Sequence, residues 1–167
     1  SNGEDAIKVV RHENPEVVIL DEPTSALDVL TQTNIFNLLK RVKQEFDVSF
    51  ILIKHDIATS SELAERVGVM YAGQIIEVSD AARFFEEPLH PYSRALLSAV
   101  PLPDPDKKRP DRVRLKGEVP SPLAKPSGCP FRTRCPLAEP ECAEQIPPLL
   151  EVKPGHWLAC PVVERTL

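Results

Sequence analysis

The stretch 16–28, EVVILDEPTSALD, decides the fold that the sequence predicts. It opens with a nearly continuous apolar run, rich in β-branched residues, and the run ends in two adjacent carboxylates, Asp21 and Glu22. Such a run is typical of a strand that is buried on both faces, as in a parallel sheet. We therefore expect a buried strand over residues 16–21 that carries two carboxylates at its C-terminal end.

The residues that follow continue an α/β pattern. Apolar side chains between residues 29 and 46 recur at helical spacing, and Asp28 is suited to cap the N-terminus of that helix. Residues 48–53, VSFILI, predict a second buried strand. A strand, a helix and a strand of these lengths form a βαβ unit with a parallel sheet.

The sequence beyond this unit predicts shorter elements. We expect a short helix over 56–65, then two strands over 66–72 and 74–78, which Ala72 and Gly73 join as a terminal hairpin. A helix over 80–87 stops before Pro88, and Pro91 opens another helix over 92–100. Residues 101–128 predict an irregular connection.

The composition changes along the chain. Sixteen of the 18 prolines lie at or after Pro88, and the four cysteines all lie between Cys129 and Cys160. Such a shift marks a boundary. We expect three parts: an α/β part over 1–87, a connection over 88–128, and a small, irregular cysteine-rich region over 129–167.

The charge and hydropathy of the chain limit the classes of function. A hydrophobic content of 42% with mixed charge is typical of a soluble globular protein, and the net charge of −5 argues against a nucleic-acid binder. The sequence has neither an apolar run long enough to span a membrane nor a basic-then-apolar leader. A soluble, intracellular protein is the expectation.

The acidic pair is the main candidate for catalysis. Ligands of open α/β sheets bind at the carboxyl ends of the strands, where Asp21 and Glu22 are expected to lie. One carboxylate there can hold magnesium, and the other can orient or deprotonate an attacking water. The alternative interpretation is that the two residues are only the polar end of a strand.

Two longer motifs carry a resemblance to a known family. Residues 20–28, LDEPTSALD, closely resemble the Walker B motif and D-loop of ABC-type ATPases, and residues 50–56, FILIKHD, resemble the strand and switch histidine of that family. Lys54 stands where many members carry threonine. The fold that this resemblance implies is the C-terminal half of an ABC ATPase domain, with parallel strands, helices and a terminal hairpin.

The resemblance also implies residue roles. Asp21 would help to hold magnesium, Glu22 would be the general base for the water that attacks the γ-phosphate of ATP, and His55 would contact that phosphate and the water. Asp28, with Ser25 nearby, would face an opposing ATPase subunit. Phosphoryl transfer depends on positioning and charge neutralisation, so these side chains must be accurately placed.

Two motifs that ATP hydrolysis by this family requires are missing from the sequence. No glycine begins a phosphate-cradling G-x-x-x-x-G-K-[ST] loop, and the LSGGQ-like signature is absent. We therefore interpret the chain as a fragment that neither binds ATP tightly nor hydrolyses it alone.

A third pair of motifs resembles one branch of the family. Residues 69–77, VMYAGQIIE, and residues 90–96, HPYSRAL, are similar to the ATP-binding subunits of oligopeptide and dipeptide importers. The resemblance implies a second ATPase subunit, two membrane permeases and an extracytoplasmic peptide-binding protein as partners, at the cytoplasmic face of the membrane. Related importers carry nickel, sugars or opines instead of peptides.

The four cysteines predict a metal centre. Cys129, Cys135, Cys142 and Cys160 follow the spacing C-x5-C-x6-C-x17-C. Thiolate ligands favour zinc or an iron–sulfur cluster, and these gaps are wider than those of most structural zinc sites. Free thiols and disulfides are further alternatives, although a reducing compartment disfavours disulfides. The family resemblance implies a [4Fe–4S] cluster at these cysteines, for which we favour a structural role over redox sensing or docking.

A second class of function competes with the transporter. The chain is alternatively a metal-binding regulatory or docking module that keeps a decayed ATPase half. The missing phosphate loop favours this alternative, whereas the retained Asp21, Glu22, Asp28 and His55 argue against decay.

Overall fold

The computed structural model describes residues 8, 12–25, 27–57, 63–100, 113–121 and 123–167. The chain divides into two units, Ser1–Leu63 and Ala64–Leu167. The predicted helix over 56–65 falls mainly on residues 58–62, which lie outside the described residues. The expected division into parts 1–87, 88–128 and 129–167 stays a prediction.

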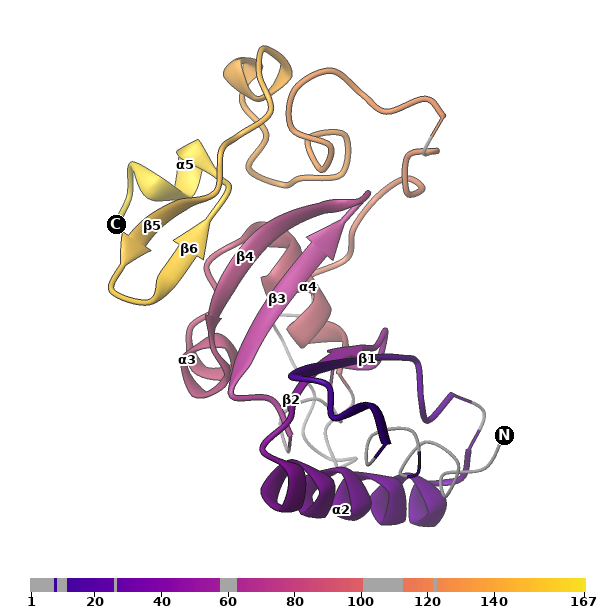
Figure 1. Ribbon diagram of the computed structural model, residues 1–167. Coiled ribbons are helices and arrows are strands. Elements are labelled where there is room, and N and C mark those ends of the chain that lie inside the picture. Colours follow the sequence, from indigo (N-terminus) through magenta and orange to yellow (C-terminus); the bar gives the residue numbers. More distant parts are fainter. Residues whose placement is uncertain (1–7, 9–11, 26, 58–62, 101–112, 122) are drawn as a thin grey trace. The chain divides into compact units, whose positions relative to one another are not determined.

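The first unit contains a parallel strand pair and one long helix. Strand β1 (Val17–Asp21) pairs with β2 (Ser49–Ile53), and helix α2 (Val29–Phe46) connects them (Figure 1). The predicted βαβ unit is confirmed. Asp28 caps α2 as predicted, because its side chain accepts a hydrogen bond from the backbone N–H of Thr31.

The core of this unit lies on one face of the strand pair. Val42 of α2 and Val48 are buried there and pack with partly buried apolar residues of the helix and both strands, namely Val18, Leu38, Phe46 and Phe50. Helical spacing in α2 and alternation in the strands bring these side chains to a shared face.

The expectation that both strands are buried on both faces is wrong for this chain. The opposite face carries four apolar side chains that stay between 48% and 64% exposed, namely Val17, Ile19, Ile51 and Ile53. The physical reason is that side chains of a strand alternate between two faces, and α2 covers only one of them.

The second unit begins with an antiparallel hairpin. Strands β3 (Arg66–Tyr71) and β4 (Gln74–Asp80) are joined by Ala72 and Gly73, whose φ angles of 48° and 80° are those of a tight hairpin turn. Helices α3 (Ala81–Glu86) and α4 (Pro91–Ala99) follow, with Pro91 in the first turn of α4. These elements confirm the sequence-based expectations. Among the described residues, no helix is long and apolar enough to cross a membrane.

The cysteine-rich region over 129–167, called the tail below, has more regular secondary structure than predicted. Strands β5 (Leu150–Lys153) and β6 (His156–Leu158) pair with each other, and β6 also pairs with β4, so that the hairpin becomes a four-stranded antiparallel sheet in the order β3-β4-β6-β5 (Figure 1). A 3₁₀ helix, η2 (Pro140–Ala143), and a short helix, α5 (Pro161–Glu164), complete the tail. The sequence did not predict these elements, because they are short and their pairing partner β4 is distant in sequence.

A buried carboxylate joins three segments of this unit. Glu77 of β4 is fully buried and accepts hydrogen bonds from the backbone N–H groups of Leu89 and His90, just before α4, at 2.8 and 2.9 Å. His156 of β6 is also fully buried and places Nε2 2.7 Å from Glu77 Oε1. A buried carboxylate is tolerated only when such partners satisfy it, so the three segments are held together.

An aromatic cluster attaches the cysteine-rich region to β3 and α4 of the same unit. Phe131 is fully buried, and its ring meets those of Tyr71 and Tyr92 at centroid distances of 5.1 and 5.4 Å. The His90 ring also lies in this cluster, 5.7 Å from Phe131. Burial lowers the pKa of His90 to about 3, so the neutral ring caps α4 by accepting from the N–H of Tyr92 through Nδ1.

Substitution of Glu77 is expected to destabilise the second unit strongly. Glu77→Ala leaves two backbone N–H groups and His156 without their buried acceptor, at a cost of about 3–5 kcal/mol in the free energy of unfolding. Chemical denaturation followed by the fluorescence of Trp157 in β6 measures this change. Glu87→Gln is the control, because it removes only an exposed ion pair with Lys153 and leaves stability nearly unchanged. Equal effects of the two substitutions would contradict the stabilising role of the buried Glu77 hydrogen bonds.

Candidate functional site

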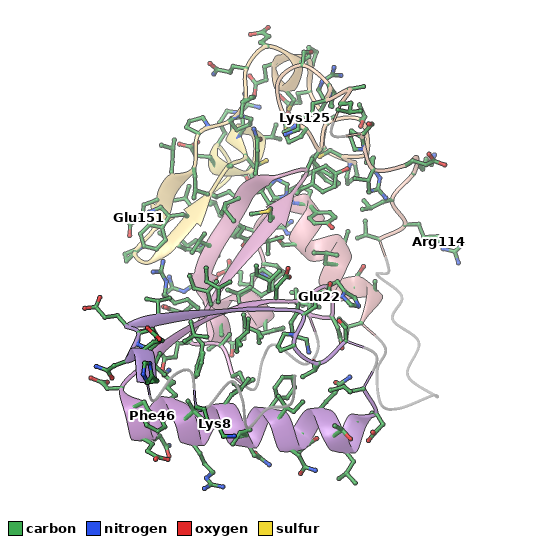
Figure 2. The ribbon with its side chains drawn as sticks, turned by 45° about the vertical axis from the view of Figure 1, so that its right-hand side comes forward. Lys8, Glu22, Phe46, Arg114, Lys125 and Glu151 are labelled. Atoms are coloured by element: carbon green, nitrogen blue, oxygen red, sulfur yellow. The ribbon has the colours of Figure 1, made fainter. Side chains whose placement is uncertain are left out.

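The parallel register of the strand pair brings two predicted site segments to one edge. Asp21 stands opposite Ile53 at the C-terminal ends of β1 and β2. The backbone N–H of Glu22 extends the ladder by donating to the carbonyl of Ile53 at 3.0 Å. Glu22, labelled in Figure 2, therefore follows β1 at the edge where His55 follows β2.

Glu22 and His55 are in direct contact. His55 Nδ1 lies 2.8 Å from Glu22 Oε1, with side chains that are 74% and 44% exposed. The structure thus brings together the two residues that the sequence proposed as catalytic. Because both side chains remain accessible, a phosphate or a water molecule can reach them.

The turn after β1 adds a second contact to Glu22. The backbone N–H of Ser25 donates to the carbonyl of Glu22 at 3.1 Å, and the Ser25 hydroxyl donates to Glu22 Oε2 at 2.7 Å. The φ angle of Glu22 is 44°, which lies in the left-handed region that side chains rarely adopt. The hydrogen bonds from Ser25 and then from His55 lower the pKa of Glu22, because both favour its charged form.

Asp21 and Asp28 lie on either side of this turn. Asp21 is the last residue of β1 and is exposed. It lies on the same face of the strand as the exposed Val17 and Ile19. Asp28 is turned toward its own helix, where Thr31 donates to it twice: the backbone N–H to Oδ1 at 3.0 Å and the hydroxyl to Oδ2 at 2.6 Å. The side-chain hydrogen bond from Thr31 is the main cause that lowers the pKa of Asp28.

The four cysteines lie on separate segments of the second unit. Cys142 is in η2 and Cys160 immediately precedes α5, and both are buried. Cys129 and Cys135 are half-buried and flank Phe131. The backbone N–H of Cys129 donates to the carbonyl of Cys142 at 2.8 Å, which fixes two of these segments to each other.

The thiols are close enough to influence one another. Burial raises the pKa of the Cys135 thiol to about 11, and repulsion from Cys160, Cys129 and Cys142 acts in the same direction. All four cysteines are free thiols, which disfavours the disulfide alternative. Within the described part of the chain, however, no group of three or more His, Cys, Asp or Glu side chains is placed to hold a metal ion.

Sequence reasoning missed two long-range polar contacts in the second unit. Arg165 contacts Glu139 through Nη2 at 2.6 Å and Glu141 through Nη1 at 2.9 Å, and so joins the end of α5 to η2. His156 makes the second of these contacts, with Glu77. No local pattern signals either contact, since the partners are far apart in the sequence.

Comparison with known proteins agrees with this geometry. Residues 76–142 match the family described as Oligopeptide/dipeptide transporter, C-terminal region. The chain is 49% identical over 148 residues to the putative oligopeptide transport ATP-binding protein YkfD of Bacillus subtilis, an alignment that covers 88% of this chain and 45% of that protein. It is 48% identical over 147 residues to the oligopeptide transport ATP-binding protein OppF of Salmonella typhimurium, which covers 87% of this chain and 44% of that protein.

The fold and the comparisons together identify the protein family. A parallel strand pair that ends in Asp21–Glu22, with His55 at the same edge, agrees with the C-terminal part of an ABC-type ATPase fold, to which the comparisons point. The chain belongs to the oligopeptide and dipeptide transporter family of ATP-binding proteins. It spans about half the length of the curated relatives that it matches, 45% in the case of YkfD.

A single added methyl group is expected to disturb the cysteine-rich region. Gly128 has a φ of +62°, and a Cβ there would lie 2.7 Å from the backbone carbon of Ala143, next to Cys142. Gly128→Ala therefore combines backbone strain with a clash against main chain, at a cost of about 3 kcal/mol in the free energy of unfolding. Denaturation followed by Trp157 fluorescence measures it.

The matched control is Gly117→Ala. Gly117 has a similar φ of +75°, but the nearest atom to an added Cβ is Arg134 Cγ at 4.0 Å. This variant carries the strain without the clash, so it should lose clearly less stability than Gly128→Ala. Equal losses would contradict close packing of Gly128 on the segment of Cys142.

Proposed function

We propose that this chain forms part of the ATP-hydrolysing subunit of an ABC importer for peptides. Glu22 acts as the general base, His55 contacts the γ-phosphate and the attacking water, and Asp21 supplies an oxygen ligand to magnesium. The observation that carries the proposal is the 2.8 Å contact between Glu22 and His55 at the shared edge of β1 and β2.

The residue types at this edge suit phosphoryl transfer. A carboxylate such as Asp21 is the hard oxygen donor that magnesium prefers, and the bound ion neutralises charge on the phosphates. Glu22 accepts the proton of the attacking water, so that the resulting hydroxide bonds to the γ-phosphorus as the bond to the ADP oxygen breaks. His55, in contact with Glu22, orients the water between the carboxylate and the phosphate.

The proposal places further parts of the site outside this sequence. The phosphate-cradling loop and the signature motif are absent from the 167 residues. The chain alone is therefore proposed to be inactive. Ser25 and Asp28, which are exposed beside the acidic edge, are proposed to face a second ATPase subunit.

The names of the relatives support the proposed cargo class. YkfD and OppF are described as oligopeptide transport ATP-binding proteins. We assign to this chain the same cargo class, two membrane permeases and an extracytoplasmic peptide-binding protein, with the ATPase at the cytoplasmic face of the membrane. The alternative of a decayed ATPase half is disfavoured, because decay would not preserve the paired contacts of Glu22 with Ser25 and His55.

Replacement of the proposed base is expected to stop hydrolysis without stopping ATP binding. In the full-length subunit, Glu22→Gln removes the proton acceptor and should lower kcat by at least about 100-fold, with ATP still bound. Steady-state phosphate release and equilibrium ATP binding measure the two effects. Glu16→Gln, just before the start of β1, is the control and should hydrolyse ATP normally. A Glu22→Gln variant with the wild-type rate would contradict the proposal.

We also propose that the four cysteines hold a [4Fe–4S] cluster. Its support is that the four thiols gather in one region, close enough to act on one another's pKa. A single zinc ion draws four sulfurs to within about 2.3 Å of one point, whereas the irons of a cluster bind one thiolate at each corner. The wide spacing C-x5-C-x6-C-x17-C favours a cluster over zinc, whose structural sites mostly use closer cysteine pairs. The thiolates would hold the irons, and the cluster would join otherwise separate segments.

The proposed role of this cluster is structural. Cys142 and Cys160 belong to η2 and to the start of α5, and Cys129 and Cys135 flank the buried ring of Phe131. A cluster bound to all four would fix Phe131 against Tyr71 and Tyr92, and with it the tail against β3 and α4. Binding to the folded state alone contributes directly to stability.

Metal analysis of anaerobically prepared protein tests the cluster. We expect about four irons and four sulfides per chain, and a loss of both in Cys142→Ser, which removes one corner ligand. Iron and acid-labile sulfide assays, with visible absorption, measure them. Ser127→Ala is the control, since Ser127 lies two residues before Cys129 and its hydroxyl accepts a hydrogen bond from Arg132. Stoichiometric zinc without iron would contradict the cluster.

A further inference from the structure

Both carboxylate oxygens of Glu22 are hydrogen-bonded within this chain. His55 Nδ1 lies 2.8 Å from Oε1, and the Ser25 hydroxyl donates to Oε2 at 2.7 Å. A general base needs an oxygen that the attacking water can reach at hydrogen-bond distance. Ser25 therefore takes up one of the acceptor positions at which Glu22 would receive the attacking water.

Asp28 is engaged within its own chain in the same way. Both of its carboxylate oxygens accept hydrogen bonds from Thr31. Gln32 Nε2 donates to the carbonyl of Leu27 at 3.0 Å and so ties the turn to the first turns of α2. The two residues proposed to face a second ATPase subunit are thus both held by internal partners.

An external contact of Ser25 must compete with its contact to Glu22. A serine hydroxyl has a single proton to donate, so it cannot donate to Glu22 Oε2 and to an acceptor on another subunit at the same time. Ser25 is exposed, which leaves its hydroxyl accessible to such an acceptor. Pairing of subunits through Ser25 therefore removes a hydrogen bond from Glu22.

We propose that Ser25 is a positioning residue that holds Glu22 Oε2 in the unpaired subunit and releases it when a second subunit docks. The inference rests on the proposed function, and it adds a regulatory step: docking and the freeing of the base are one event. Because such coupling is reciprocal, whatever favours release of Ser25 from Glu22 also favours docking.

Removal of the Ser25 hydroxyl tests this link in the full-length importer. Ser25→Ala should raise the basal ATPase rate, measured without peptide and binding protein, by about fivefold or more, with little change in the KM for ATP. The ratio of stimulated to basal rate should fall correspondingly. Ser25→Thr keeps a hydroxyl and should restore a low basal rate. Ser49→Ala, an exposed serine at the opposite end of β2, is the control and should match the wild type.

A spectroscopic measurement follows the same contact without depending on hydrolysis. In the ¹³C-glutamate-labelled subunit, the carboxyl signal of Glu22 is assigned from its loss in Glu22→Gln. In the unpaired state this signal should differ between the wild type and Ser25→Ala, and coincide between the wild type and Ser25→Thr. Addition of a non-hydrolysable ATP analogue should shift the wild-type signal as the subunits pair.

The outcomes separate the two proposals. Absence of ATP hydrolysis by the wild-type importer would overturn the proposed function and this inference with it. Hydrolysis by the wild type together with an equal or lower basal rate in Ser25→Ala would overturn the inference alone. A Glu22 signal that is the same in the wild type and in Ser25→Ala would also overturn it.

Discussion

The parallel pairing of β1 and β2 is the constraint on which the proposed chemistry depends. Residue-by-residue pairing from Val17 with Ser49 to Asp21 with Ile53 makes the two strands end together. Two parallel strands joined by a helix have their carboxyl ends at the same edge, so the residues that follow them meet. A shift of one residue would turn every side chain of the shifted strand to the other face and move Glu22 away from His55. The 2.8 Å contact between these two residues is a consequence of the register.

The second unit depends on a different kind of interaction. Its sheet contains strands from two distant stretches, and the buried carboxylate of Glu77 joins β4, the start of α4 and β6 through His156. Phe131 then attaches the segment between Cys129 and Cys135 to the same core. The proposed cluster would complete this arrangement by joining η2 and α5, which Arg165 already connects by ion pairs. These long-range polar and aromatic contacts act together with a buried apolar cluster of Leu89, Leu158, Cys160 and Val163 in the same unit.

The features that were predictable from the sequence are those with a local cause. Helix α2 has the predicted bounds because its apolar spacing and its cap, Asp28, act within a few residues. Strands β5 and β6 were missed because segments of 4 and 3 residues carry little periodic signal. Ser25 and Glu22 are only three residues apart, yet nothing in the residue types predicts that the Ser25 hydroxyl donates a hydrogen bond to the Glu22 carboxylate. Burial of β1 on both faces was predicted from composition, which does not reveal what covers each face.

The most direct measurement of the central claim is an experimental structure of the full-length Glu22→Gln subunit with ATP and magnesium bound. The account predicts the γ-phosphate at the carboxyl ends of β1 and β2, with Asp21 on the side of the magnesium ion and His55 against the phosphate. ATP bound elsewhere, with His55 and the substituted position 22 apart from the phosphate, would contradict it.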